Sequence, residues 1–279
     1  MLQGKLQVIL LGTDPEDIDK KVDRQVQELN EAAREAFAIE LAAGFITGLG
    51  SGKKEILPSA AEDHLTRAQR KAVEKLSAEY FGYISEFNEA AGEQLKKKAR
   101  KIIEQGGPEQ LLKDEILQYA QGIWGGSETV VIDRVGQTKT VIEVTKDKTL
   151  RKVEKEITKA YKTNVTAYSD MLARTASHSA YEDGRAAAYQ EEGLKQWRFI
   201  GPVDERSRPE HAAIVGEHFT YGTPESEMAQ ELLHEPNCRH RATPYYDDPQ
   251  FNTPQEEFEQ QKTEMGLYWD ETQDKWMFK

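Results

Sequence analysis

The chain has 279 residues, 31% of them charged, and its 49 acidic and 37 basic residues give a net charge of -12. A surface of this sign repels nucleic acid on average, so contact with DNA would need a local basic patch. The single cysteine excludes an internal disulfide, so we expect a protein made and used in a reducing cytoplasm. The apolar run at 8–11 is too short for a signal-peptide core or a membrane span, so we expect no membrane partner.

The first half of the chain has the period of long amphipathic helices. Residues 13–16 have the pattern of a capping box with proline in the first turn, and apolar residues follow at steps of three and four. This helix is expected to end between 44 and 52, where glycines interrupt the period. A second helix is predicted from Thr66 to the glycines at 106–107, and a shorter one over 109–123.

The glycine-rich segment 48–54 invites comparison with a phosphate-binding loop. Such a loop has glycine five residues before its Gly-Lys pair and Ser or Thr after the lysine, but Thr47 and Lys54 occupy these places. The segment is therefore interpreted as a flexible link between helices.

A change in residue choice marks strands in the middle of the chain. β-branched residues at 130–135 and 141–144 flank Gly136-Gln137, which predicts a β-hairpin over 129–145 that lies on the helices or pairs with another sheet. Helical period then resumes over 149–192 and stops at Gly193.

The remaining sequence predicts a small module and a tail. Residues 196–246 are rich in Trp, Phe, Pro and His, and Ser207-Arg208-Pro209-Glu210 has the pattern of a capped short helix. The tail, 247–279, has nine acidic residues and three lysines, and its aromatic segments 267–269 and 275–278 predict a small hairpin that docks on another surface. We therefore expect an α+β protein with a helical domain (1–195) that includes the β-hairpin, a loop-rich module (196–246) and an acidic tail (247–279).

A basic cluster lies near the end of the second predicted helix, at Lys96, Lys97, Lys98, Arg100 and Lys101. A solvated face that complements the helix dipole is one explanation. Contact with DNA phosphates or with an acidic partner is the other.

The histidines and the cysteine gather between 211 and 240. Cys238 and His240 are two residues apart and would point to the same side of an extended segment, while His234 and His211 lie upstream. Zinc binds such a mixture of imidazole and thiolate, and a module with a small core benefits from the cross-link. We therefore consider His211, His234, Cys238 and His240 as ligands of a structural zinc ion, although their spacing matches no standard zinc finger.

Two other interpretations of this cluster stay open. In the first, the histidines form hydrogen bonds and the cysteine is a buried thiol, with no metal bound. Alternatively, His234 and Asn237 with a metal, and Asp204 as a further carboxylate, would support a nuclease or toxin, although no nucleophile, base and orienting group have a recognisable spacing.

The order of short blocks between 170 and 246 resembles the phage Mu protein F-like family of minor head, or head-morphogenesis, proteins. The blocks are Ala-Arg-Thr with Arg174, Gly-Arg with Gly184, then Trp197, the Asp-Glu-Arg-Ser-Arg-Pro-Glu-His block with Asp204 and Arg206, Gly216, and Asn-Cys-Arg with Asn237. In many members of this family the block that corresponds to Asp204–His211 carries two cysteines three residues apart, and the last block ends in another cysteine. Here Arg208 and His211 stand at the first two places and His240 at the last, so Arg208 is expected to pair with Asp204 or an acidic neighbour.

The resemblance implies a structural and not an enzymatic role. It implies a minor capsid protein of a tailed virus or prophage that associates with the portal protein and capsid proteins during head assembly and DNA packaging. The expected location is the virion, at the capsid interior or portal vertex, with the host cytoplasm as the site of assembly. Long amphipathic helices would suit such docking.

Overall fold

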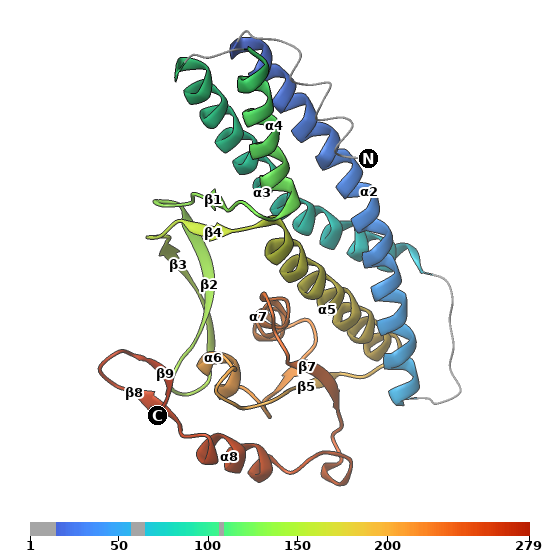
Figure 1. Ribbon diagram of the computed structural model, residues 1–279. Helices are drawn as coiled ribbons and strands as arrows, with labels where there is room; N and C mark the ends of the chain where they lie inside the picture. The colour runs from blue at the N-terminus through green and yellow to red at the C-terminus, as the bar shows by residue number, and fades with distance from the viewer. Residues whose placement is uncertain (1–14, 57–64, 106–108) are drawn as a thin grey trace. The chain divides into compact units, whose positions relative to one another are not determined.

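The computed structural model describes residues 15–56, 65–105 and 109–279, and these form an α+β architecture, as predicted (Figure 1). The chain divides into two compact units. What we call the helical unit contains Met1–Ile39, Lys75–Gln137 and Glu156–Ala173, and the C-terminal unit contains Glu40–Glu74, Thr138–Lys155 and Arg174–Lys279. Three helices contribute to both units: α2 (Pro15–Ile56), α3 (Arg67–Gln105) and α5 (Val165–Glu191). The boundaries expected at 195 and 246 stay predictions.

In the helical unit, α2, α3 and α4 (Glu109–Gly125) lie side by side (Figure 1). Their buried apolar side chains follow the predicted stripes: Val22, Val26, Tyr80, Phe87, Ala91, Leu95, Ala99, Ile116, Ala120 and Ile123. A polar pair crosses the same interface, because Asn88 Nδ2 donates to Asn30 Oδ1 at 2.7 Å. The predicted capping residues Thr13 and Asp14 and the apolar run at 8–11 lie outside the described residues.

The predicted break at 44–52 is wrong, because α2 continues through these glycines to Ile56. Gly44, Gly48 and Gly52 recur every fourth residue and pack on α5. A Cβ atom at Gly48 would lie 1.9 Å from the Tyr181 carbonyl oxygen, and one at Gly184 of α5 would lie 2.1 Å from the Phe45 carbonyl oxygen. Glycine lowers helix propensity by about 1 kcal/mol, but here the missing side chains allow two helix backbones to approach closely. The interpretation of 48–54 as a flexible link is wrong for the same reason.

The start of α3 follows the predicted capping box. The backbone N–H of Thr66 donates to Gln69 Oε1 at 2.7 Å, and the backbone N–H of Gln69 donates to Thr66 Oγ1 at 3.3 Å. Two of the backbone donors that a helix start leaves without partners are therefore bound. α5 ends as expected at Gly193, whose φ of 81° suits glycine.

The predicted hairpin over 129–145 is wrong in its pairing. β1 (Val130–Ile132) pairs antiparallel with β4 (Tyr161–Thr163), and β2 (Thr138–Val144) pairs with β3 (Leu150–Glu156). Gly136 does not reverse the chain between β1 and β2. Its N–H instead bonds to the Ile157 carbonyl at 2.9 Å. The helix expected from 149 is also wrong over 149–164, where charged residues on the exposed positions of β3 give the sequence a helical appearance.

The C-terminal unit contains a three-stranded antiparallel sheet of order β6-β5-β7, formed by β6 (His218–Thr220), β5 (Gln196–Ile200) and β7 (Arg241–Tyr245). Helices α6 (Pro209–Ala213) and α7 (Pro224–Leu233) contribute to the same core. At its centre, Trp197 is fully buried and its Nε1–H donates to Ser226 Oγ at 2.9 Å. The short helix was predicted, but Ser207 does not cap it: Arg208 is the N-cap residue, and Ser207 Oγ donates to the Pro202 carbonyl at 2.7 Å.

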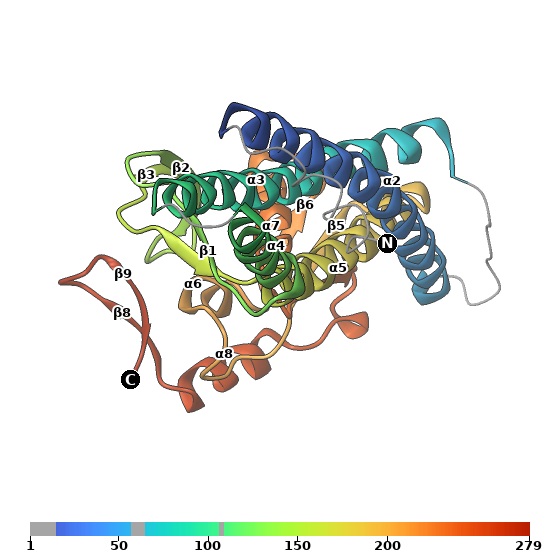
Figure 2. The same ribbon diagram turned by 45° about the horizontal axis from the view of Figure 1, so that its top comes forward.

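The tail contains a short 3-10 helix η1 (Pro249–Phe251), helix α8 (Gln255–Glu264) and the hairpin of β8 (Leu267–Asp270) and β9 (Lys275–Phe278), which confirms the predicted hairpin (Figure 2). Trp276 Nε1 donates to the Thr145 carbonyl at 3.0 Å. Phe258 of α8 belongs to the core of the C-terminal unit, so the tail docks on this core. Among the described helices, none combines the length and the apolar character needed to cross a membrane.

Candidate functional site

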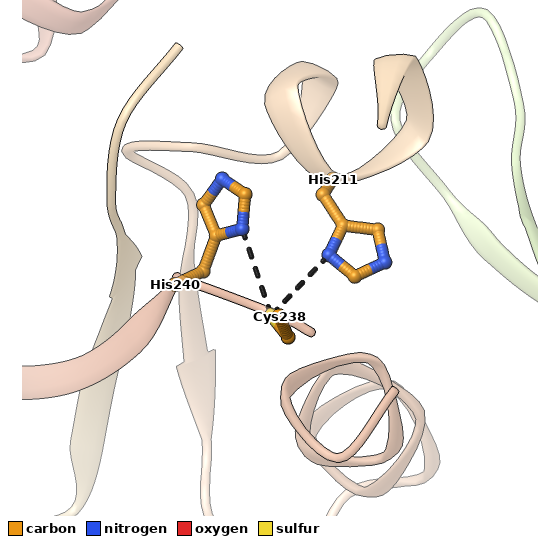
Figure 3. A group of neighbouring side chains, drawn as sticks. All are labelled: His211, Cys238 and His240. Carbon is orange, nitrogen blue, oxygen red and sulfur yellow. Dashed lines mark hydrogen bonds between the residues drawn. The ribbon is translucent and has the colours of Figure 1, made fainter. Parts of the chain in front are cut away.

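Three of the four side chains considered as metal ligands converge in the C-terminal unit. His211 lies on α6, while Cys238 and His240 lie on the segment that leads into β7 (Figure 3). Cys238 Sγ is 3.6 Å from His211 Nδ1 and 3.6 Å from His240 Nδ1. One donor atom from each residue lies within 4.8 Å of the others. Among the described residues, this is the group of histidine, cysteine and carboxylate side chains that is arranged to hold a metal ion.

His234 does not belong to this group. It is the C-cap residue of α7, and its Nε2 lies 2.8 Å from Asp183 Oδ1. The predicted set of four therefore divides into three convergent side chains and one histidine paired with a carboxylate. His218, in β6, stacks on Tyr245 with ring centroids 4.2 Å apart, so it also lies outside the group.

Burial keeps His240 and Cys238 uncharged near neutral pH. His211 is 0% exposed and His240 is 3% exposed. The ring of Phe199 stacks on the ring of His240, with the ring centroids 5.1 Å apart. Desolvation, together with repulsion from His211, lowers the pKa of His240 to about 3. Desolvation also raises the pKa of the partly buried Cys238 thiol to about 11. His240 and Cys238 therefore present a neutral imidazole and a neutral thiol, which can form hydrogen bonds or, after loss of the thiol proton, bind a metal.

Ion pairs hold the loop before α6. Arg239 Nη1 donates to Asp204 Oδ2 at 2.9 Å, and this contact holds the pKa of the Asp204 carboxyl well below its usual range. The backbone N–H of Arg206 donates to the same carboxylate at 3.0 Å. Arg208 was expected to pair with Asp204 or with an acidic neighbour, and it pairs with the neighbour. Its Nε lies 3.4 Å from Glu235 Oε2, while Asp204 pairs with Arg239.

The other residues that carry the resemblance have mainly structural positions. Arg174 is exposed on α5. Gly184 faces the backbone of α2, and a Cβ atom at Gly216, with a φ of 89°, would lie 2.7 Å from Phe258. The backbone of Asn237 is left-handed, with a φ of 59°, and its N–H donates to Thr175 Oγ1 at 3.3 Å.

Two residues that sequence reasoning did not single out complete the group. Glu235 Oε2 lies 3.0 Å from His211 Nε2, and the Pro202 carbonyl lies 3.1 Å from His240 Nε2. Burial would raise the pKa of Glu235, but the hydrogen bond with His211 lowers it, so this carboxylate is ionised at neutral pH. Glu235 follows the candidate ligand His234 directly in the sequence, so its position beside the cluster could have suggested it. A backbone carbonyl such as that of Pro202 leaves no signal in residue type.

The basic cluster of α3 is partly neutralised within the helical unit. Lys96 Nζ lies 2.8 Å from Asp23 Oδ1, and Arg100 pairs with Asp19. The hydrogen bond with Asp19 is the main cause of the raised pKa of Arg100. The remaining members of the cluster, Lys97, Lys98 and Lys101, are exposed.

Comparison with known proteins gives one match. The model of a family described as Phage Mu protein F like protein matches residues 137–243. No curated protein and no solved structure matches the chain. The matched segment includes β2, β3, α5, the strands β5 and β6 and the first part of β7, and it contains the three convergent side chains.

Proposed function

Because residues 137–243 form a phage Mu protein F-like region, we propose that this chain is a minor head protein that acts at the portal vertex of a tailed phage or prophage. The family match is the observation that carries the proposal, since it covers the segment in which the resemblance to head-morphogenesis proteins was recognised. We place the protein in the virion, at the capsid interior or portal vertex, after assembly in the host cytoplasm.

The positions of the candidate catalytic groups support a structural role over a nuclease. The alternative, a metal-assisted nuclease centred on His211, His234, Cys238 and His240, would need His234, Asn237 and Asp204 beside the same metal. His234 instead pairs with Asp183, and the Asp204 carboxylate accepts hydrogen bonds from Arg239. His234 and Asp204 are thus held by other side chains, and a role in head assembly requires no chemical reaction at these residues.

We propose that the helical unit provides the surface that binds the portal protein. Five of the eight large apolar side chains exposed among the described residues belong to this unit, although it is the smaller of the two. They are Ile39, Tyr83, Val131, Val135 and Tyr161. Exposed apolar side chains in such density favour a protein partner over solvent alone.

Coexpression with the portal, scaffolding and major capsid proteins of the same phage or prophage would test the proposal. The parent chain should be recovered in purified particles in a few copies. A variant with Val131→Glu, Val135→Glu and Tyr161→Glu should fold, because these side chains are exposed, but should be depleted from particles at least tenfold. Phe251→Glu, which changes an exposed apolar residue of the C-terminal unit, is the control and should be incorporated like the parent. Particles that lack the parent chain, or that incorporate both variants equally, would contradict the proposal.

We also propose that Lys97, Lys98 and Lys101 contact packaged DNA. Three phosphate contacts predict that the logarithm of the binding constant falls with the logarithm of salt concentration with a slope of about -2.7. Changing the three lysines to glutamine should abolish this slope. Replacing Lys96, which already binds Asp23, should change DNA binding little. Binding that does not depend on salt would contradict this contact.

A further inference from the structure

The distances within the group of His211, Cys238 and His240 match those of a tetrahedral zinc site. Zinc binds imidazole nitrogen at about 2.0–2.1 Å and thiolate sulfur at about 2.3 Å, so tetrahedral angles place nitrogen and sulfur ligands about 3.6 Å apart. Both nitrogen-to-sulfur distances in the structure are 3.6 Å. Both nitrogen-to-sulfur distances therefore match those of a tetrahedral zinc site, and the three donor atoms lie within 4.8 Å of one another.

The hydrogen bonds on the far side of each imidazole direct the free lone pairs toward the sulfur. The Pro202 carbonyl can only accept, so His240 must carry its proton on Nε2 and present an unprotonated Nδ1. A carboxylate also only accepts hydrogen bonds, so Glu235 favours the same tautomer of an uncharged His211 imidazole, with the proton on Nε2. Histidines that bind metals commonly donate their second ring N–H to a carboxylate or a backbone carbonyl in this way.

When both imidazoles carry their single proton on Nε2, hydrogen bonds alone do not satisfy this arrangement. The Cys238 thiol has one proton, and it can donate to only one of the two Nδ1 lone pairs that face it. The other lone pair would remain without a donor, and a buried acceptor in this condition costs about 1–3 kcal/mol. A cation between the three atoms satisfies both nitrogens and the sulfur at once.

We propose that His211 Nδ1, Cys238 Sγ and His240 Nδ1 bind one zinc ion, with a water molecule as the fourth ligand. On binding, the thiol transfers its proton to solvent and the thiolate forms the sulfur–zinc bond, while both imidazoles remain neutral. The ion joins α6 to the segment that leads into β7, and so cross-links the loop-rich part of the C-terminal unit. This inference is independent of the proposed role in head assembly, because it rests only on the geometry of the group.

Metal analysis of the full chain, purified without added metal, tests the site. We expect about one zinc per chain, and less than a tenth of that in Cys238→Ser and in His240→Gln. His234→Gln is the matched control, because His234 lies in the same module but pairs with Asp183, and it should keep about one zinc. Glu235→Ala should bind zinc 10–100-fold more weakly, since the tautomer of His211 loses its carboxylate partner.

Cobalt spectroscopy of the parent chain tests the same site without a substitution that might prevent folding. Zinc exchanged for Co²⁺ should give a sulfur-to-cobalt charge-transfer band in the near ultraviolet and the intense visible bands of four-coordinate cobalt. A parent chain without zinc that gives no such spectrum on titration with Co²⁺ would overturn the proposal. Copper in the isolated protein, or a zinc content unchanged in Cys238→Ser, would equally overturn it.

Discussion

The close crossing of α2 and α5 predicts opposite effects for two alanine substitutions only two residues apart. Gly48 and Gly50 are both in α2, so alanine should raise the intrinsic helix propensity by about 1 kcal/mol at either position. A Cβ atom at Gly50 meets nothing within 4 Å, whereas at Gly48 it would lie 1.9 Å from the Tyr181 carbonyl oxygen. The difference between the two variants therefore isolates the helix contact from propensity.

The magnitude follows from the obstacle at Gly48. The atom in the way belongs to the backbone of α5, so no rotamer change can relieve the contact, and the helices must separate by about 1.1 Å to reach the shortest separations that real Cβ atoms show. Overpacking of this kind typically costs about 1–3 kcal/mol, and here it also loosens the contact between Gly44 and Ala180. We expect Gly48→Ala to lower the free energy of unfolding by about 2 kcal/mol and Gly50→Ala to raise it by about 0.5–1 kcal/mol.

Thermal unfolding followed by far-ultraviolet circular dichroism is the assay. For a chain of this size, about 1 kcal/mol shifts Tm by about 2–4 °C, so Tm should fall by about 4–8 °C in Gly48→Ala and rise by about 1–4 °C in Gly50→Ala. If Gly48→Ala is as stable as the parent or shifts in the same direction as Gly50→Ala, the two helices do not cross at these glycines, and the explanation of why α2 continues through them is wrong.

Three further predictions concern the C-terminal unit. Ser226→Ala should lower the free energy of unfolding in urea by about 1–3 kcal/mol, because it leaves the buried Trp197 Nε1–H without an acceptor, and the loss should disappear in a Trp197→Phe background. Gly216→Ala should lower the free energy of unfolding more than Gly222→Ala. Both glycines have a positive φ, which costs alanine about 1–2 kcal/mol, but only alanine at 216 also clashes with Phe258 of α8. Equal losses of stability in the two variants would show that α8 does not dock there. Burial would raise the pKa of Glu259, but hydrogen bonds from two lysines lower it to about 2, below its ordinary value of 4.5. Its contribution to stability should therefore be present above pH 4.5 and be lost as the pH falls toward 2, and Glu259→Gln should flatten the acid limb of Tm against pH in that window.

Residue patterns predicted the elements whose signals are local. The capping box at Thr66, the stop of α5 at Gly193 and the aromatic hairpin of the tail each depend on contacts within a few residues, and the structure contains all three. The glycines of α2 led to a wrong prediction of a helix end, because they are explained by close packing on α5, more than a hundred residues away in the sequence. β3 was wrongly predicted to be helical because both of its faces are largely exposed, so its sequence lacks the alternation of apolar and polar residues that indicates a strand.

The candidate site shows the same limit within a single short block. Cys238 and His240 were expected on one side of an extended segment, and their donor atoms do face each other. His234 precedes a change of direction, because it ends α7 and the backbone turns through the left-handed region at Asn237 before Cys238. A spacing of four residues therefore carries no information on whether His234 and Cys238 share a ligand shell. The third member, His211, comes from another element, and the sheet that brings α6 beside the start of β7 could not be derived from spacing. Three protein ligands instead of four leave one coordination position of the proposed zinc for water.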